Sequence, residues 1–350
     1  MAVFTVPNVR ICGLSACVPK NTEDNMALKL LSDAERVSFV NTVGIRYRRV
    51  VENGITASDL CYAAAEKLLT ELNWNRNDIK LLVFISQTPD YIIPNTASVL
   101  HEKLALAKDC IAFDINLGCS GYVYGLSVLG SLLQNMHGAK ALLLVGDVST
   151  KTISPKDKST VSLFSDAGTA TALMNDDNNF MHFNLQTDGS EYDDIMIPDG
   201  GFRNPVNSRS FEEKEYAKGV VRNNIQMKLD GVKIFNFSLR EIAPNILSLM
   251  TEKGIEQSSI DFFVMHQANL LMLESVRKKL KIEADKVPYS LYDYGNTSSA
   301  SVPVTMVTKL REVLQQKTVK LLLSGFGVGL SWGSVYLETQ NITCCELIEV

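Results

Sequence analysis

The stretch WNRNDIKLLVFI, residues 74–85, recurs in outline as IEQSSIDFFVMH, residues 255–266, about 180 positions further along the chain. Each copy follows an amphipathic stretch and ends in an apolar run typical of a buried strand. A second pair, AKALLLVG (139–146) and VKLLLSG (319–325), is separated by nearly the same distance. Because two independent pairs share one offset, the sequence predicts two similar halves.

The remainder of the chain alternates between the same two kinds of segment. Short apolar runs bounded by turn residues predict strands, and stretches with apolar residues every three or four positions predict helices. This alternation is typical of an α/β fold with a largely parallel sheet covered on both faces, divided here into halves 1–175 and 176–350. The predicted strands are 9–18, 80–86, 110–117, 140–146, 262–266, 319–327 and 334–338, and the predicted helices are 57–72, 96–106, 122–136, 239–254 and 270–280.

Composition excludes several classes of function. The chain has 350 residues, a formal net charge of −5 and no basic run, which argues against a nucleic-acid-binding protein. No apolar run reaches the ~18 residues of a membrane span, and the first residues do not resemble a signal peptide. Seven cysteines without a C-x-x-C pair indicate a reduced, cytoplasmic location, and Cys344–Cys345 is interpreted as part of an edge strand.

Three chemically capable residues lie at expected strand-to-helix junctions or at the comparable place in the second half. Cys119 lies in NLGCSGYVYGLSVL where a helix begins, His266 ends the run FFVMH, and Asn296 opens NTSSASVPVTM in the second half. Because the carboxyl ends of strands and the N-termini of helices meet at the ligand-binding edge of such sheets, we expect the three side chains to converge. Taken singly, they have ordinary structural explanations: a core cysteine, a core histidine and a turn asparagine.

Their chemistry suits a thioester substrate. A helix N-terminus is expected to lower the pKa of the Cys119 thiol and favour the nucleophilic thiolate. The backbone N–H of Cys119, with one from the glycine-rich loop 325–329, can stabilise an oxyanion. A neutral His266 and the amide of Asn296 can donate hydrogen bonds to a thioester carbonyl as it becomes an enolate.

Four segments carry a resemblance to a known family. INLGCSGYVYGLSVL, MHQANLLMLESVRKKL, YDYGNTSSASVPV and GFGVGLSWGS resemble the β-ketoacyl-acyl carrier protein synthase III enzymes of the thiolase superfamily. The resemblance covers about residues 9–338 and implies a duplicated five-layered α-β-α-β-α fold and a homodimer. It implies that Cys119 accepts the acyl group, that His266 and Asn296 bind the malonyl thioester and promote its decarboxylation, and that no metal or redox cofactor is needed.

The same resemblance implies further contacts, and at several positions this sequence departs from the residues usual in the family. Val328 would supply the second oxyanion N–H, Ile93 would reach the partner's acyl pocket in place of a phenylalanine, and Arg277, Lys278 and Lys279 would face the carrier protein. Ser38, Thr42 and Lys158 replace the tryptophan and two arginines of the family's CoA site, and Leu271 replaces the arginine after HQAN. A serine and a lysine cannot form an aromatic–guanidinium sandwich around an adenine.

We therefore interpret the chain as an acyl-condensing transferase of lipid or fatty acid biosynthesis. Cys119 takes an acyl group from acyl-CoA or an acyl carrier protein, and a malonyl thioester then undergoes decarboxylative Claisen condensation with it. One alternative is an acyltransferase that modifies an alcohol or amine without condensation. Another is a non-catalytic subunit that binds a carrier protein. Residues 190–225 are polar and are predicted to lie over the entrance of the site.

Overall fold

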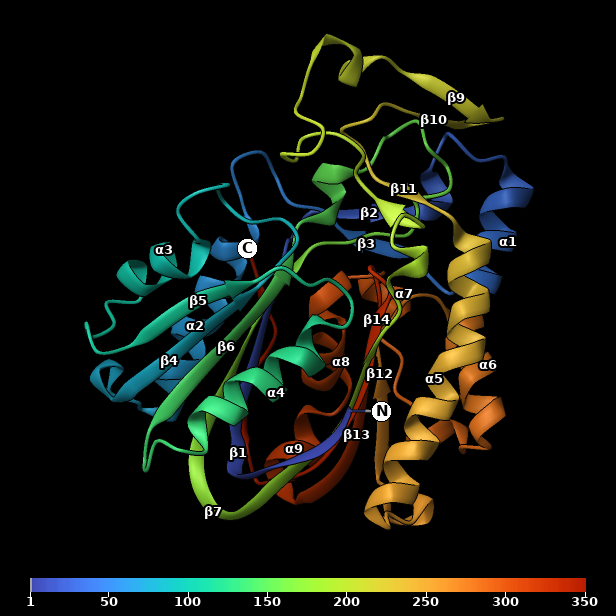
Figure 1. The fold of residues 1–350 in the computed structure, drawn as a ribbon. Coiled ribbons are helices and arrows are strands. Elements are labelled where there is room, and N and C mark those ends of the chain that lie inside the picture. The colour runs from blue at the N-terminus through green and yellow to red at the C-terminus, as the bar shows by residue number, and fades with distance from the viewer. Residues whose placement is uncertain (1) are drawn as a thin grey trace.

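Five layers, helix–strand–helix–strand–helix, build the computed structural model, which describes residues 2–350 (Figure 1). The first strand layer contains β5, β4 and β6, and the second contains β12, β13 and β14. Two long strands, β1 and β7, run through both layers and join them into one continuous sheet. The bounds are β1 Ala2–Val18, β4 Ile79–Ile85, β5 Ile111–Ile115, β6 Lys140–Asp147, β7 Ala167–Thr187, β12 Phe262–Met265, β13 Thr318–Gly327 and β14 Ser331–Gln340.

The repeated sequence is a repeated piece of structure. Leu82 of β4 pairs in parallel with Leu142 of β6, and Phe263 of β12 pairs in parallel with Leu322 of β13, about 180 residues later. Each parallel pair is followed by an antiparallel neighbour, β7 after β6 and β14 after β13. The expected largely parallel sheet was therefore wrong: the sheet is mixed, because β7 runs antiparallel to β1, β6 and β14, and β14 also runs antiparallel to β13.

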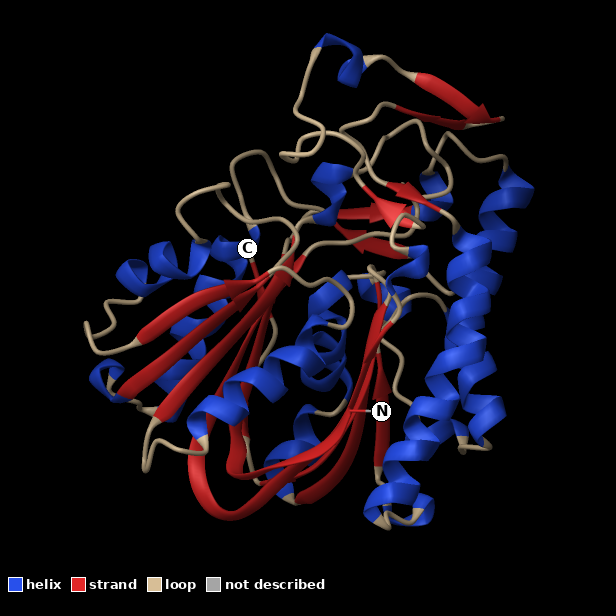
Figure 2. Cartoon of the chain, in the orientation of Figure 1, coloured by secondary structure: helices blue, strands red, loops and turns tan. Residues whose placement is uncertain are grey.

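Strand β7 was not predicted, although it is central to both strand layers. Its residues 167–174 pair with β6 and its residues 181–187 pair with β14. Between these parts the polar run 175–179 interrupts the apolar pattern. The strand β7, found by its label in Figure 1, curves strongly near the bottom of the view in Figure 2. The predicted boundary between halves 1–175 and 176–350 falls inside this strand, and the division into two domains stays a prediction.

Helices cover and separate the strand layers. Outer helices α2 (Ala57–Leu72) and α3 (Thr96–Lys103) pack on the first layer, and α5 (Gly231–Lys253) and α6 (Leu270–Leu280) cover the second. Between the two layers lie α4 (Gly121–Leu133), α8 (Ser301–Lys309) and α9 (Arg311–Gln316). Figure 1 shows α4 and α8 between the two groups of strands.

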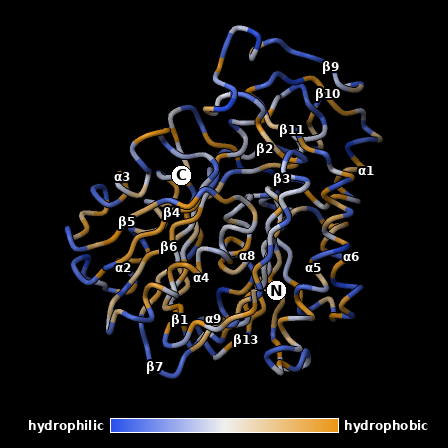
Figure 3. Tube along the Cα trace, viewed as in Figure 1, coloured by the Kyte–Doolittle hydropathy of each residue, from blue (hydrophilic) through white to orange (hydrophobic). Residues whose placement is uncertain are grey.

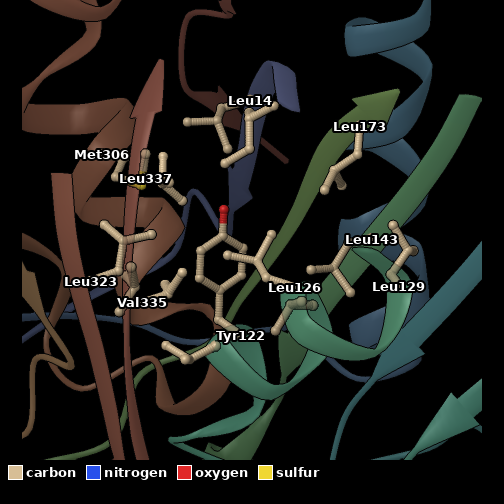
Figure 4. Packing of buried hydrophobic residues seen from close by; sticks show 14 of the residues in the cluster. Leu14, Tyr122, Leu126, Leu129, Leu143, Leu173, Met306, Leu323, Val335 and Leu337 are labelled. Atoms are coloured by element: carbon tan, nitrogen blue, oxygen red, sulfur yellow. The ribbon is translucent and has the colours of Figure 1, made fainter. Parts of the chain in front are cut away.

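The buried apolar residues form three clusters that correspond to the spaces between the layers. One cluster fills the space between the strand layers around α4 and α8, and one lies under each outer helical layer. Tyr122 of α4 stands in the middle cluster between Leu126 and Leu323, and its hydroxyl meets Thr171 Oγ1 at 3.2 Å (Figure 4). The phenol is thus buried with a hydrogen-bond partner, as a buried tyrosine requires.

A cap of short elements, much of it hydrophilic, lies above the carboxyl ends of the parallel strands (Figure 3). The polar segment 190–225, expected to lie over the entrance of the site, contains three short strands. Elsewhere, β15 and β16 extend the edge of β1, and short 3-10 helices occur at 25–27, 76–78, 149–152, 189–191, 208–211, 257–259, 284–286 and 298–300. The cap and edge elements are β2 Thr22–Asp24, α1 Asp33–Val43, β3 Tyr47–Arg49, β8 Ile195–Met196, β9 Lys214–Ala217, β10 Val220–Arg222, β11 Lys228–Leu229, α7 Leu291–Tyr294, β15 Thr343–Cys344 and β16 Ile348–Glu349.

Candidate active site

A cavity of about 290 Å³ lies under the cap and brings together the three residues expected to converge. Cys119, His266 and Asn296 all line it, although the chain separates the first from the others by more than a hundred residues. They are 7%, 2% and 6% exposed, so substrate reaches them only through this cavity. Residues 195–197 of the cap also line the cavity, as the expected position of the segment 190–225 requires.

Cys119 lies two residues before the first residue of α4, in a setting that only glycines allow. A Cβ on Gly327 would lie 2.7 Å from Cys119 Cβ and 2.9 Å from its Sγ, and one on Gly325 would lie 2.9 Å from the Cys119 carbonyl oxygen. The end of β13 therefore packs directly on the nucleophile. The Ser298 hydroxyl oxygen lies 3.9 Å from Sγ.

The expected lowering of the Cys119 pKa was wrong. Burial raises the pKa of the Cys119 thiol to about 12, and the hydrogen bond with Ser298 and the backbone N–H groups of Cys119 and Val328 oppose this only in part. The thiol lies before α4 begins and is almost fully buried, so the desolvation of a thiolate outweighs the helix N-terminus. The resting nucleophile is a protonated thiol.

His266 follows β12, and its ring is held by a neighbouring helix. Its backbone N–H donates to the Ser324 carbonyl at 2.7 Å, and its Nδ1 lies 2.7 Å from Ser301 Oγ at the start of α8. Burial lowers the pKa of His266 to about 3, so the imidazole is neutral at physiological pH. A Ser301 hydroxyl that donates to Nδ1 leaves the ring proton on Nε2, which makes Nε2–H a donor.

Asn296 follows Gly295, whose backbone conformation other residues do not readily adopt. Gly295 has φ 58° and ψ −157°, and a Cβ there would lie 3.2 Å from the Leu163 carbonyl oxygen. The carboxamide oxygen of Asn296 accepts the Ser298 N–H at 2.9 Å. With its oxygen bound in this way, the amide NH2 is the group that Asn296 can offer to a ligand in the cavity.

Val328 occupies a site that tolerates a side chain. It lines the cavity, and its backbone N–H approaches the Cys119 sulfur closely enough to oppose the raised thiol pKa. Only its neighbour Gly329, at φ 124°, needs a glycine conformation, and Val328 is not among the residues with positive φ. Val328 therefore offers its N–H without backbone strain, beside the N–H of Cys119.

A buried carboxylate, which the sequence analysis missed, connects two loops of the site by hydrogen bonds. Asp147, at the end of β6, accepts Gln87 N–H at 2.7 Å through Oδ1 and Ser299 N–H at 3.2 Å through Oδ2. The hydroxyls of Ser86 and Ser299 donate to the same two oxygens. Burial raises the pKa of Asp147. Because Ser299 follows Asn296 by three residues, Asp147 joins the Asn296 loop to the end of β4.

Other residues singled out from the sequence lie elsewhere. Ile93 is 84% exposed and does not line the cavity of its own chain. Ser38 and Thr42 are exposed on α1, and Lys158 Nζ is 3.2 Å from Glu35 Oε1 on the same helix. The Lys158 ammonium is therefore partnered within the chain.

The basic run on α6 is only partly available to a partner. Arg277 donates two hydrogen bonds to Glu274 and one to the Ile282 carbonyl, and its side chain is 18% exposed. Lys279 Nζ donates to the Leu239 carbonyl at 2.6 Å. Lys278 is 71% exposed and lies 4.0 Å from Glu274, so it is the most accessible cation of the three.

The described residues contain neither a group of metal-binding side chains nor a membrane-spanning helix. Within residues 2–350, no three His, Cys, Asp or Glu side chains are grouped as metal ligands. None of the helices in that range is both long and apolar enough to cross a bilayer.

Comparison with known proteins agrees with this geometry. Residues 113–189 match the 3-oxoacyl-[acyl-carrier-protein] synthase III family model, and residues 250–339 match the model of its C-terminal part. The chain is 31% identical to a β-ketoacyl-[acyl-carrier-protein] synthase III of Streptococcus uberis over 92% of this chain and 96% of that one. It is 30% identical to the Clostridium perfringens enzyme of the same name over 95% and 99%.

A solved structure gives the same answer. The 3-oxoacyl-(acyl-carrier protein) synthase of Burkholderia xenovorans superimposes with a TM-score of 0.93 at 37% identity, covering 99% of each chain. The duplicated five-layered arrangement is the thiolase fold, which confirms the predicted fold class. Within that class, the chain belongs to the 3-oxoacyl-[acyl-carrier-protein] synthase III family.

Proposed function

We propose that this protein condenses an acyl group held on Cys119 with a malonyl thioester to give a 3-oxoacyl thioester. The observation that carries the proposal is the convergence of Cys119, His266 and Asn296 in one cavity, with the Cys119 and Val328 N–H groups at the sulfur. Membership of the family and the names of the relatives support the same reaction.

The first step is acyl transfer to the thiol. Cys119 Sγ attacks the carbonyl carbon of an acyl-CoA or acyl-carrier-protein thioester, and the Sγ–C bond forms as the old S–C bond breaks. The Cys119 proton ends on the departing thiol. The N–H groups of Cys119 and Val328 stabilise the negative oxygen of the tetrahedral intermediate. Because the resting thiol is protonated, this step requires proton transfer as well as attack.

The second step is decarboxylation and carbon–carbon bond formation. The bond between the malonyl carboxylate and its α-carbon breaks, CO2 leaves, and the electron pair forms an enolate. His266 Nε2–H and the Asn296 amide donate to the enolate oxygen, and a neutral imidazole stabilises it without protonating the carbanion. The carbanion attacks the acyl carbonyl and expels the Cys119 thiolate, which takes a proton from solvent. No metal or redox cofactor enters either step.

The proposal includes a homodimer in the cytoplasm. Strand β5 ends the sheet, and within residues 2–350 its outer edge has no partner strand. Ile111 on this strand is 51% exposed, and Ile92 and Ile93 are 75% and 84% exposed. An unpaired strand edge with exposed apolar side chains suits pairing with a second copy. In such a dimer, Ile93 would close the partner's acyl pocket.

Acyl carrier protein or CoA delivers both thioesters in this proposal. Carrier protein would contact the surface of α6, where Lys278 is the accessible cation and Arg277 and Lys279 are engaged within the chain. Leu271, 47% exposed on the same helix, adds no charge, so electrostatic attraction is expected to be modest.

Intact-protein mass spectrometry tests the proposal. The wild type and Cys119→Ala are incubated with a panel of acyl-CoAs and acyl-carrier proteins, and malonyl-carrier protein is then added. The expected result is an adduct that requires Cys119 and is discharged with release of CO2. An adduct that malonyl thioester leaves in place would favour acyl transfer to an alcohol or amine. Absence of an adduct with every donor would favour a non-catalytic subunit that binds a carrier protein.

A further inference from the structure

The lining of the cavity is apolar on one side and polar on the other. Ile195, Met227, Leu229, Ile234 and Met272 provide apolar surface from the cap, α5 and α6. The loops that follow β4, β5 and β6 provide Gln87, Thr88, Asn116, Ser149 and Thr152. A plain hydrocarbon chain would be a poor partner for this second side, because polar groups would lose water without gaining hydrogen bonds.

Two of the polar groups are already occupied. Thr88 Oγ1 accepts the Val148 N–H at 2.9 Å, and Thr152 Oγ1 donates to the Ser149 carbonyl at 2.8 Å. These hydroxyls hold the loops after β4 and β6 in place, and they therefore have a structural role.

Gln87 and Ser149 differ from these two residues. The structure records no hydrogen bond from another residue in 2–350 to the Gln87 carboxamide or to the Ser149 hydroxyl, and Ser149 is 4% exposed. Their backbones are nevertheless fixed, because Gln87 N–H donates to Asp147 and Ser149 follows Asp147 by two residues. Ser149 is buried and Gln87 is exposed, and both carry polar groups without partners on fixed backbones, so both groups are available to bind a ligand.

The carboxamide of Gln87 lies beside the nucleophile. A Cβ on Gly118, the residue before Cys119, would lie 2.3 Å from Gln87 Oε1 and 3.6 Å from Ser298 Oγ. Gly118 thus leaves the space that the Gln87 amide fills, next to the backbone of Cys119. Because Gln87 and Cys119 line the same cavity, an acyl group on Sγ shares this space with the Gln87 amide.

We propose that the acyl group carried by Cys119 is short and bears a hydroxyl or oxo group, which Gln87 and Ser149 bind. This inference rests on the proposed acylation of Cys119. A carboxamide and a hydroxyl each donate and accept, so together they can bind a hydroxyl or an oxo oxygen. A site built to hydrogen-bond a substituent discriminates strongly against the analogue that lacks it.

The test compares two donors with the same carbon chain, butyryl and 3-hydroxybutyryl, each supplied as the CoA and the carrier-protein thioester. The rate of Cys119 acylation is followed by mass spectrometry for the wild type, Gln87→Leu and Ser149→Ala. Gln134→Leu is the matched control, because Gln134 follows α4 at the end away from the cavity and donates to the Ser131 carbonyl. Size-exclusion chromatography with light scattering records the oligomeric state of each variant.

We expect the wild type and the control to prefer the hydroxylated donor by about tenfold or more, and the two cavity variants to reduce the ratio toward one. Equal rates for the two donors in the wild type, or faster butyryl transfer, would overturn the proposal while leaving the acylation of Cys119 intact. So would a Gln87→Leu variant that changes oligomeric state and keeps the wild-type ratio, because Gln87 would then belong to a subunit contact. Absence of any adduct would instead refute the proposed function itself.

Discussion

Replacing Asp147 with asparagine tests whether one buried carboxylate holds the site together. Each oxygen of Asp147 accepts a different backbone N–H, from Gln87 on Oδ1 and from Ser299 on Oδ2. An asparagine has only one oxygen, so in either orientation its NH2 group faces one of these N–H groups. One buried backbone donor loses its partner, which costs about 1–3 kcal/mol of unfolding free energy.

The measurement is urea unfolding of Asp147→Asn beside Asp109→Asn, in which an exposed carboxylate loses only its ion pair with Lys80. The control is expected to change the unfolding free energy by less than about 1 kcal/mol. An Asp147→Asn protein within about 0.5 kcal/mol of the wild type would refute the reasoning, because it would show that the two N–H groups find other acceptors. If the loop of Ser299 is the one released, kcat for condensation also falls more than the rate of Cys119 acylation.

Three further predictions concern the residues around the nucleophile. The rate of Cys119 alkylation by iodoacetamide, measured by peptide mapping, should rise about tenfold per pH unit from pH 7 to 9, since the pKa of the thiol is raised to about 12. A plateau of this rate between pH 7 and 9 would contradict the prediction. The folded protein keeps His266 neutral down to a pKa of about 3, whereas the unfolded chain binds the proton below 6.5, so stability falls as the pH drops through this range. Between pH 7 and 5, His266→Asn should therefore gain about 2 kcal/mol in unfolding free energy relative to the wild type, and a pH-independent difference would argue against a buried neutral ring. Gly327→Ala places a Cβ 2.9 Å from Sγ and should slow Cys119 acylation about 100-fold, whereas Gly189→Ala, with nothing within 4 Å, should keep the wild-type rate in the same assay.

The candidate catalytic residues Cys119 and His266 could be singled out from the sequence because each stands where a predicted strand gives way to the next segment. Asn296 was expected at a comparable junction in the second half, but in the structure it follows α7 and Gly295 rather than a strand. Asp147 obeys the same rule: it is a charged residue that ends the apolar run of β6. That signal was available and was missed because a lone aspartate after a strand has no catalytic partner in the sequence. Gln87 and Ser149 acquire significance only when the cavity shows what they face.

Elements that lack periodicity were also missed. Strand β7 carries small residues and a polar interruption, so neither its length nor its antiparallel pairing follows from an apolar run. Helix α1 has no buried residue and hence no apolar stripe, although Ser32 and Glu35 form the capping box that marks its start. The pKa of Cys119 was predicted in the wrong direction because its burial depends on the packing of the end of β13 against it, which no local pattern reveals.

The passage of β1 and β7 through both strand layers has a consequence for how the molecule folds. A chain cut between residues 175 and 176 would leave each fragment without part of a strand that its own sheet requires. We therefore expect neither fragment to close its core alone, and we expect the repeated halves to unfold together as one cooperative unit. Cys119 comes from one half, and His266 and Asn296 come from the other. The site therefore forms only after the whole chain has folded. A partly folded molecule has no assembled active site with which cellular thioesters could react.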